Sequence, residues 1–313
     1  MICISTWLKQ LLQGAQQQQQ QQQSTTTTTP IYVNFNSIPI ADDQRGRDLI
    51  GILNNLVGLE SVYRNYLHVR VPPLVHSSHL TTPSTDIYLT PDAERTMFGL
   101  GFVAVDKYVA QRKQQYMDLI DWTVEDSWIT LDYNTPSISN DLILKAFASK
   151  MNVYVMDHCL HESVTGLLPN TGSAFFYQTS TDWMGKKGDI EMTLGVARDW
   201  LSKYPNTFII ITDGANGLAA GGCFKRGVNH QATYIAPFWH YALPTMQQEH
   251  CKDTIGAGDA FRAGMLFSIL QDQSMSQCLN FASAAGALNT RYYGGCSRVP
   301  DLSEVLQMLQ DNN

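Results

Sequence analysis

The sequence lacks three features that would mark other classes of protein. It has no uninterrupted apolar run of about 18 residues, so no membrane-spanning helix is predicted. Its 21 Lys and Arg residues are outnumbered by 28 Asp and Glu, and a formal net charge of −7 argues against a nucleic-acid partner. Its six cysteines show no paired spacing, which predicts reduced thiols in a cytoplasmic protein.

Two common site signatures are also missing. The absence of a G-x-S-x-G pattern argues against a serine hydrolase. The stretch Asp157-His158-Cys159-Leu160-His161 has no distant C-x-x-C partner that would complete a zinc site. We therefore interpret it as a loop at the end of a strand.

The first 29 residues differ in composition from the rest of the chain. Glutamine and threonine tracts occupy residues 16–29, without an apolar residue to bury, so residues 1–29 are predicted to be disordered. Ordered structure is predicted over residues 30–313. Within about 62–101, short β-type runs are separated by prolines and serines, which predicts lid strands paired as hairpins.

Strand and helix patterns alternate through the middle of the chain. This order predicts an α/β fold with a parallel sheet covered by helices. The strands are expected at 127–133, 152–158 and 207–212, and the helices at 108–120, 140–150 and 191–204. Upstream, 31–40 is expected to be a strand and 42–59 a helix, and three further helices are expected to begin near 258, 276 and 302.

The stretch KDTIGAGDAFRAG (252–264) predicts a tight turn that leads into a helix. Gly256 and Gly258 permit the turn, and the first N–H groups of the helix would favour an anion such as phosphate. Asp259 then has two interpretations. It is either a first-turn carboxylate that stabilises the helix, or a general base beside a transferring phosphoryl group.

The pattern D-T-x-G-A-G-D-x-F-x-x-G, met from Asp253 to Gly264, resembles the C-terminal signature of PfkB/ribokinase-type carbohydrate kinases. The resemblance implies a doubly wound, mostly parallel sheet flanked by helices, with a small β lid. It implies an ATP-dependent kinase that phosphorylates a hydroxyl of a sugar or sugar-like substrate. Asp259 would be the catalytic base, and Gly256, Ala257 and Gly258 would form the anion hole.

Two further segments extend the resemblance to the nucleotide. Thr212, Gly214 and Gly217 match the family's V-T-x-G-x-x-G turn along the nucleotide, with Asp213 at its variable position. The small-residue segment around Ser283 resembles the helix that borders the adenine. A glycine turn within a hairpin and close packing of two helices are the alternatives for these segments.

The resemblance also implies ATP, Mg²⁺ and a monovalent cation such as K⁺. Asp253, Gly294 and Ser297 match the positions that would hold the monovalent cation. The family's Mg²⁺-organising N-x-x-E motif has no match in residues 174–184, where Asp182 is the candidate substitute.

The N-terminal half resembles the family less. Asp43 and Gly46 match a G-x-D-x-x-G segment and Arg95-Thr96 a lid turn, but the first strand and its Gly-Gly turn are absent. The acceptor therefore stays open. A truncated, weakly catalytic homologue that binds nucleotide or a partner, or a nucleoside or vitamin kinase, is the alternative. A homodimer through the lid edge is a further expectation.

Overall fold

The computed structural model divides the chain into two compact units. One is Val105–Thr245, and the other combines Met1–Ala104 with Met246–Asn313. The residues described are 39–52, 74–77, 79–90, 95–133, 135–158, 173–184, 188–224, 233–241, 251–295 and 298–311. The predicted disordered segment 1–29 lies outside them.

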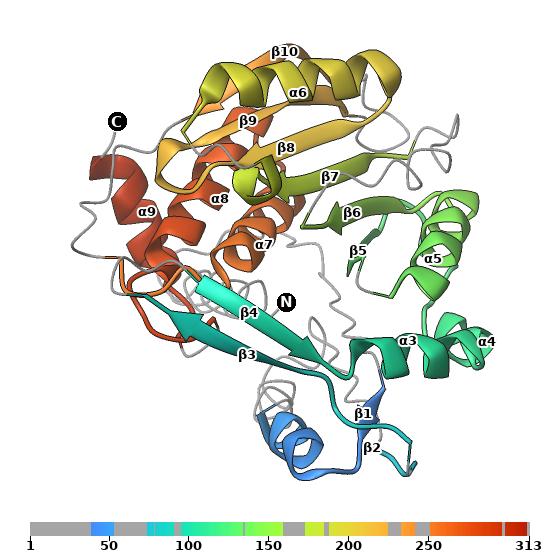
Figure 1. Ribbon diagram of the computed structural model, residues 1–313. Helices are drawn as coiled ribbons and strands as arrows, with labels where there is room; N and C mark the ends of the chain where they lie inside the picture. Colours follow the sequence, from blue (N-terminus) through green and yellow to red (C-terminus); the bar gives the residue numbers. More distant parts are fainter. Residues whose placement is uncertain are drawn as a thin grey trace, which may run out of the picture. The chain divides into compact units, whose positions relative to one another are not determined.

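The unit Val105–Thr245 is built on a six-stranded sheet with the order β10-β9-β8-β7-β6-β5 (Figure 1). The first four strands along the chain are parallel to one another. The last two return antiparallel, β9 against β8 and β10 against β9. The bounds are β5 Trp128–Asp132, β6 Asn152–Met156, β7 Phe175–Ser180, β8 Phe208–Thr212, β9 Leu218–Phe224 and β10 Thr233–Tyr241.

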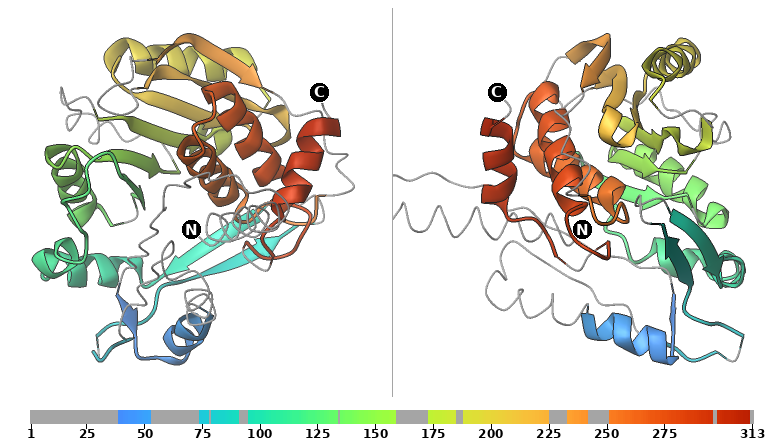
Figure 2. Two further views of the ribbon diagram at one scale, coloured as in Figure 1. Left: turned by 180° about the vertical axis from the view of Figure 1, so that it is seen from behind. Right: turned by 60° about the vertical axis from the view of Figure 1, so that its left-hand side comes forward.

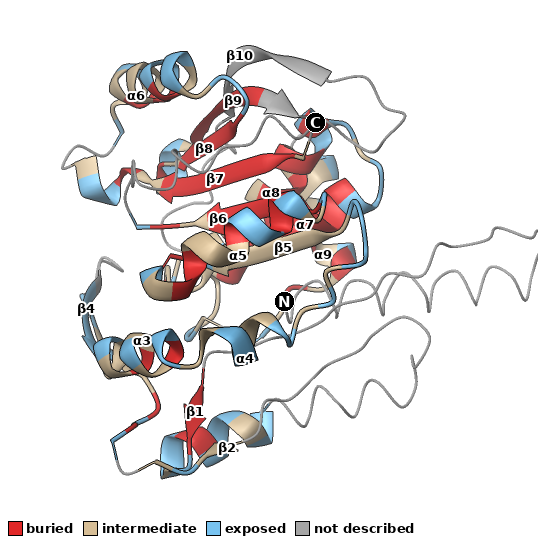
Figure 3. Ribbon diagram, turned by 90° about the vertical axis from the view of Figure 1, so that its right-hand side faces the viewer, coloured by how far each residue is buried: buried red, intermediate tan, exposed pale blue. Residues whose placement is uncertain are grey.

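Helices α5 (Pro136–Ala148) and α6 (Ile190–Lys203) pack on one face of this sheet. The ring centroids of Phe147 and Phe175 are 5.8 Å apart, and those of Trp200 and Tyr177 are 5.1 Å apart. The central strands are almost entirely buried, as Figure 3 shows. Contiguous apolar runs such as FIIIT in β8 are typical of such strands.

Strand β7 was not predicted, because its sequence FFYQTS is half polar. Gln178 and Thr179 are nevertheless only 2% exposed. The hydroxyl of Tyr154, on β6, donates a hydrogen bond to Oε1 of Gln178 at 2.7 Å. A buried polar side chain is tolerated when a partner satisfies it, and for Gln178 the neighbouring strand supplies that partner.

Two other predictions for this region need correction. The single helix expected over 108–120 is instead two short ones, α3 (Phe102–Ala110) and α4 (Lys113–Met117). The chain after β8 was expected to form a glycine-rich turn, with a glycine turn within a hairpin as the alternative. The hairpin is present, because β9 returns antiparallel to β8, and the strand β10 that follows was not predicted.

The C-terminal part of the other unit is helical. It contains α7 (Ala257–Leu270), α8 (Met275–Asn289) and α9 (Leu302–Asp311), drawn in orange to red in Figure 2. Helices α7 and α8 approach closely: a Cβ on Gly264 would lie 2.7 Å from the Cα of Ala282. All three helices were predicted from the sequence. None of the described helices is long and apolar enough to cross a membrane.

The N-terminal part of the same unit contains short strands. Strand β1 (Ile40–Ala41) pairs in parallel with β2 (Leu74–Val75). Strands β3 (Ser84–Leu89) and β4 (Arg95–Leu100) form a separate antiparallel sheet within the segment where lid strands were predicted. Residues 44–52 are helical, in agreement with the sequence pattern. Of the strand predicted over 31–40, residues 31–38 lie outside the described residues.

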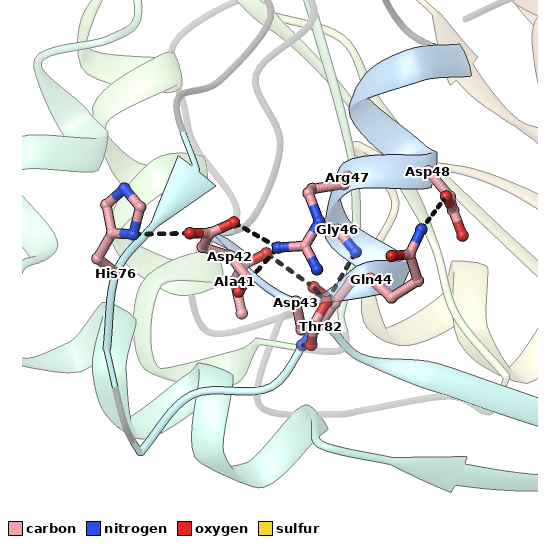
Figure 4. Close-up of polar contacts among 9 residues, drawn as sticks. All are labelled: Ala41, Asp42, Asp43, Gln44, Gly46, Arg47, Asp48, His76 and Thr82. Carbon is pink, nitrogen blue, oxygen red and sulfur yellow. Dashed lines mark hydrogen bonds and ion pairs between the residues drawn. The ribbon is translucent and has the colours of Figure 1, made fainter.

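Asp43 ties the start of this helical segment to residue 82 (Figure 4). Its Oδ1 accepts hydrogen bonds from the amide of Gly46 and the hydroxyl of Thr82, both at 2.7 Å. Its Oδ2 accepts from the Thr82 amide at 2.8 Å. Burial by itself would raise the pKa of Asp43, but the hydrogen bonds from Thr82 and Gly46 outweigh it, so the pKa lies below its usual 3.8.

Candidate functional site

The turn that precedes α7 is braced by the carboxylate of Asp253. This side chain is buried, and its Oδ1 accepts a hydrogen bond from the Ile255 amide at 2.9 Å. Its Oδ2 accepts from the Gly294 amide at 2.8 Å. From α8, the side-chain amide of Asn289 donates to the Ile255 carbonyl at 2.9 Å. Two segments distant in sequence therefore hold residues 253–256 in one conformation.

Gly256 is the residue at which the chain enters α7. Its φ of 76° is in the left-handed region, which favours glycine. A Cβ at this position would lie 2.5 Å from the carbonyl oxygen of Gly295. Glycine is therefore required at residue 256 both by the backbone conformation and by the space available. The helix then begins at Ala257, whose own N–H donates to the Thr254 carbonyl at 3.3 Å.

Asp259 lies in the first turn of α7 and is the most exposed member of the motif, with 61% of its side chain accessible. Its Oδ1 forms an ion pair with Nη2 of Arg262 at 2.9 Å. Asp259 is thus an exposed carboxylate at a helix N-terminus, and its role as a general base stays a prediction. The structure thus brings Gly256, Ala257, Gly258 and Asp259 together in one helical turn.

The small residues of α8 lie against this turn. A Cβ on Gly286 would be only 3.1 Å from the carbonyl oxygen of Ala257. Close helix packing, the alternative weighed for this segment, is therefore present. Ser283 lies on the same helix and is partly exposed, and its contact with adenine stays a prediction.

The second group of predicted residues lies in the unit Val105–Thr245, at the carboxyl end of β8. The hydroxyl of Thr212 donates to the carbonyl of Thr179 on β7 at 3.2 Å. Gly214 and Gly217 both have positive φ, 52° and 102°. A Cβ on Gly214 would meet nothing within 4 Å, so this turn is open.

Asp213 holds this turn in place. It is 4% exposed, and its Oδ1 accepts a hydrogen bond from the hydroxyl of Thr181, just after β7. Its Oδ2 accepts from the amide of Gly188, which precedes α6, at 2.7 Å. Its own amide donates to the carbonyl of Gly217 at 2.8 Å. These hydrogen bonds join the turn after β8 to the end of β7 and to the approach to α6.

Sequence reasoning missed three side chains that organise these turns: Arg262, Asn289 and Asp213. Arg262 had a detectable signal, because it lies three residues after Asp259 in a predicted helix, a spacing that permits ion pairs. Asp213 was identified only as the residue at the variable position of the glycine turn. Asn289 gave no signal, because its partner, Ile255, is 34 residues away.

The residues predicted to hold cations are only partly brought together. Asp253 and Gly294 are in contact, but through the Gly294 amide rather than its carbonyl, and Ser297 lies outside the described residues. In the part of the chain that the structure describes, no group of three or more His, Cys, Asp or Glu side chains converges. Asp182, the substitute considered for Mg²⁺, is exposed just after β7.

In the stretch 157–161, for which a zinc site was excluded, the described residues Asp157 and His158 are in contact. Nδ1 of His158 lies 2.9 Å from Oδ1 of the buried Asp157, and 78% of the His158 side chain is exposed. Cys159 and His161 lie outside the described residues.

Comparison with known proteins gives consistent results. Residues 180–302 match the model of the pfkB family carbohydrate kinases. An uncharacterized sugar kinase of Dictyostelium discoideum is 35% identical over 293 residues, covering 88% of this chain and 80% of that protein.

Solved structures agree in fold. Ribokinase from Thermotoga maritima has a TM-score of 0.56 at 17% identity, covering 87% of this chain and 79% of its own. A nucleoside kinase of Methanocaldococcus jannaschii has the same TM-score at 15% identity and the same coverage. The predicted mostly parallel α/β sheet flanked by helices is confirmed. The chain thus belongs to the pfkB family of carbohydrate kinases and has the ribokinase-like fold.

Proposed function

We propose that this carbohydrate kinase transfers the γ-phosphoryl group of ATP to a hydroxyl of a sugar or sugar-like acceptor, with Asp259 as general base. The observation that carries the proposal is the placement of Asp259 in the first turn of α7, directly after the left-handed Gly256. This one turn combines a proton acceptor with N–H groups suited to the charge of the phosphoryl group.

The proposed reaction is an in-line transfer. The acceptor hydroxyl gives its proton to the Asp259 carboxylate while its oxygen bonds to the γ-phosphorus. The bond between the γ-phosphorus and its bridging oxygen breaks, and ADP leaves with that electron pair. The amides of Gly256, Ala257 and Gly258 would stabilise the charge that spreads over the phosphoryl oxygens.

We assign the nucleotide to the turn at the end of β8. Thr212, Gly214 and Gly217 would lie along ATP, and the open space at Gly214 is compatible with a bound ligand. Ser283 would lie beside the adenine. Asp182, the candidate substitute for the missing N-x-x-E motif, would help to hold Mg²⁺. This ion is commonly bound through one or two carboxylates together with substrate phosphates.

The contacts of Asp253 and Gly294 do not favour a monovalent cation between these two residues. Both carboxylate oxygens of Asp253 already accept hydrogen bonds from backbone amides, and Gly294 presents its N–H. Asp253 therefore acts as a brace of the turn, and no step of the proposed reaction depends on this cation.

The acceptor class is open between sugars and nucleosides, since the structural neighbours include a ribokinase and a nucleoside kinase. The test is an ADP-release assay with Mg²⁺ and ATP over a panel of sugars and nucleosides. We expect turnover with at least one acceptor. Asp259→Asn should lower kcat by about 10²-fold or more, the scale of general base catalysis, without lowering Tm.

The matched control is Glu191→Gln, which neutralises a first-turn carboxylate on a different helix, α6. It should leave kcat unchanged. Turnover that survives Asp259→Asn would contradict the assignment of the base. Binding of ATP by calorimetry without turnover on any acceptor would instead favour the alternative of a weakly catalytic, nucleotide-binding homologue.

We also propose that two copies of the chain associate through β3 and β4. Tyr88 and Phe98 share one face of this hairpin, with ring centroids 5.8 Å apart, and are 64% and 57% exposed. Large exposed aromatic side chains favour a protein partner. Light scattering should report a dimer that Phe98→Asp converts to a monomer; a monomeric wild type would contradict the association.

A further inference from the structure

Asp259 and Arg262 form a pair whose members differ in burial. The two residues are one turn apart on α7, and Nη2 of Arg262 lies 2.9 Å from Oδ1 of Asp259. The side chain of Arg262 is only 14% exposed, whereas that of Asp259 is 61% exposed. The arginine is therefore the immobilised member of the pair, and the carboxylate is the accessible one.

Helix geometry explains why the guanidinium reaches the first turn. Side chains on an α-helix tilt toward its N-terminus, so a residue three positions later covers the turn before it. The Arg262 guanidinium consequently lies beside Asp259 in the first turn of α7, the turn whose amides are proposed as the anion hole. A first-turn aspartate without this partner would sample several rotamers, because most of its surface is in water.

The pair has two consequences for a base at this position. Oδ1 is held by Arg262, while Oδ2 accepts no hydrogen bond within the described part of the chain, so one oxygen stays available for an acceptor hydroxyl. A carboxylate also repels the phosphate that the helix N-terminus attracts, and a guanidinium in contact with it offsets that repulsion.

We propose that Arg262 is a positioning residue for the catalytic base: it orients the Asp259 carboxylate and offsets its charge beside the phosphoryl group. The inference rests on the proposed function, since it assigns Arg262 a role through Asp259. In the transfer step, Arg262 keeps its protons and forms no covalent bond. Its contribution is to keep Oδ2 aimed at the acceptor before the phosphoryl group arrives.

The first test is kinetic. Arg262→Met keeps most of the buried stem but removes the charge and the hydrogen bond. We expect kcat to fall by about 10- to 100-fold, the loss expected when a reacting group is misplaced, with a smaller change in KM for the acceptor. Arg262→Lys should recover part of kcat. The matched control, Arg198→Met on the exposed surface of α6, should leave kcat unchanged.

The second test separates positioning from a structural role. If Arg262 acts through Asp259, then Arg262→Met should lower kcat in the wild type but have little further effect on Asp259→Asn. A loss that is the same in both backgrounds would overturn the inference. The small variant Arg262→Ala should also regain turnover when guanidinium is added below its denaturing concentration, whereas urea at that concentration should not restore it.

The outcomes distinguish this inference from the proposed function. If Asp259→Asn retains full turnover, the assignment of the base fails and Arg262 has no base to position. If Asp259→Asn is inactive while Arg262→Met matches the wild type in kcat and Tm, only the inference about Arg262 fails. Loss of kcat in Arg262→Met with an unchanged Tm and guanidinium rescue of Arg262→Ala would support it.

Discussion

The carboxylate of Asp213 accepts a hydrogen bond from the backbone amide of Gly188 at 2.7 Å, across 25 residues of sequence. The same carboxylate accepts from the hydroxyl of Thr181. One buried side chain thus connects the turn after β8 with the end of β7 and the approach to α6. The predicted nucleotide residues Thr212, Gly214 and Gly217 surround this connection.

Asp213→Asn should therefore disturb the turn. A side-chain amide has a single acceptor oxygen and cannot replace both carboxylate oxygens, so the Gly188 N–H or the Thr181 hydroxyl loses its acceptor. The cost should be about 1–3 kcal/mol in unfolding free energy. We expect a several-fold higher KM for ATP with a smaller change in KM for the acceptor. Urea unfolding and steady-state kinetics measure the two effects.

Asp199→Asn is the control for this substitution, because Asp199 is an exposed residue of α6 in the same unit. It should change neither the unfolding free energy nor the KM for ATP. Equal increases in KM for ATP and for the acceptor in Asp213→Asn would argue against a role in nucleotide binding.

Gly256→Ala should damage both stability and activity. The new Cβ would lie 2.5 Å from the Gly295 carbonyl oxygen, and a non-glycine residue at φ 76° adds backbone strain of about 1–3 kcal/mol. Relief of the clash displaces the first turn of α7, so kcat should fall together with Tm. Calorimetry and the ADP-release assay measure both.

Gly195→Ala is the control for Gly256→Ala, and it is expected to raise stability instead of lowering it. Gly195 lies within α6, and a Cβ there would meet nothing within 4 Å. Alanine should stabilise the helix by about 0.5–1 kcal/mol. If both substitutions had the same effect on Tm, the special conformation assigned to Gly256 would be wrong.

Asp43 predicts a pH-dependent contribution to stability. The pKa of Asp43 in the folded chain is lower than its usual 3.8, so its carboxylate stabilises the fold fully above that value. The contribution is lost as the pH falls through the lowered pKa. Asp43→Asn should reduce the unfolding free energy at neutral pH by about 1 kcal/mol, a modest value because the carboxylate is partly exposed.

The measurement is urea unfolding of the wild type and Asp43→Asn from neutral pH down to the acid transition. The difference between the two proteins should shrink as the pH falls below about 3.8. A difference that grows in acid would have the wrong sign and would reject this account of Asp43.

Periodicity predicted most of the regular elements where the local pattern is strong. The apolar run of β8 and the helical spacing of α6 are clear in the sequence, and both elements were found. Strand β7 was missed because the partner of Gln178 lies on another strand. Strand β9 was anticipated only as the hairpin alternative for the glycine turn, and β10 was missed, because a glycine pattern indicates a turn but not the direction in which the chain continues.

The sequence by itself determined the motif from Asp253 to Gly264. Glycine at residue 256 permits the left-handed turn, and the apolar residues that follow form a helix, so Asp259 necessarily lies in its first turn. Only the tertiary structure decided which side chains hold this arrangement in place. Burial of Arg262, the hydrogen bond from Asn289 and the two bonds accepted by Asp213 depend on packing between distant segments, and local pattern carries no information about such contacts.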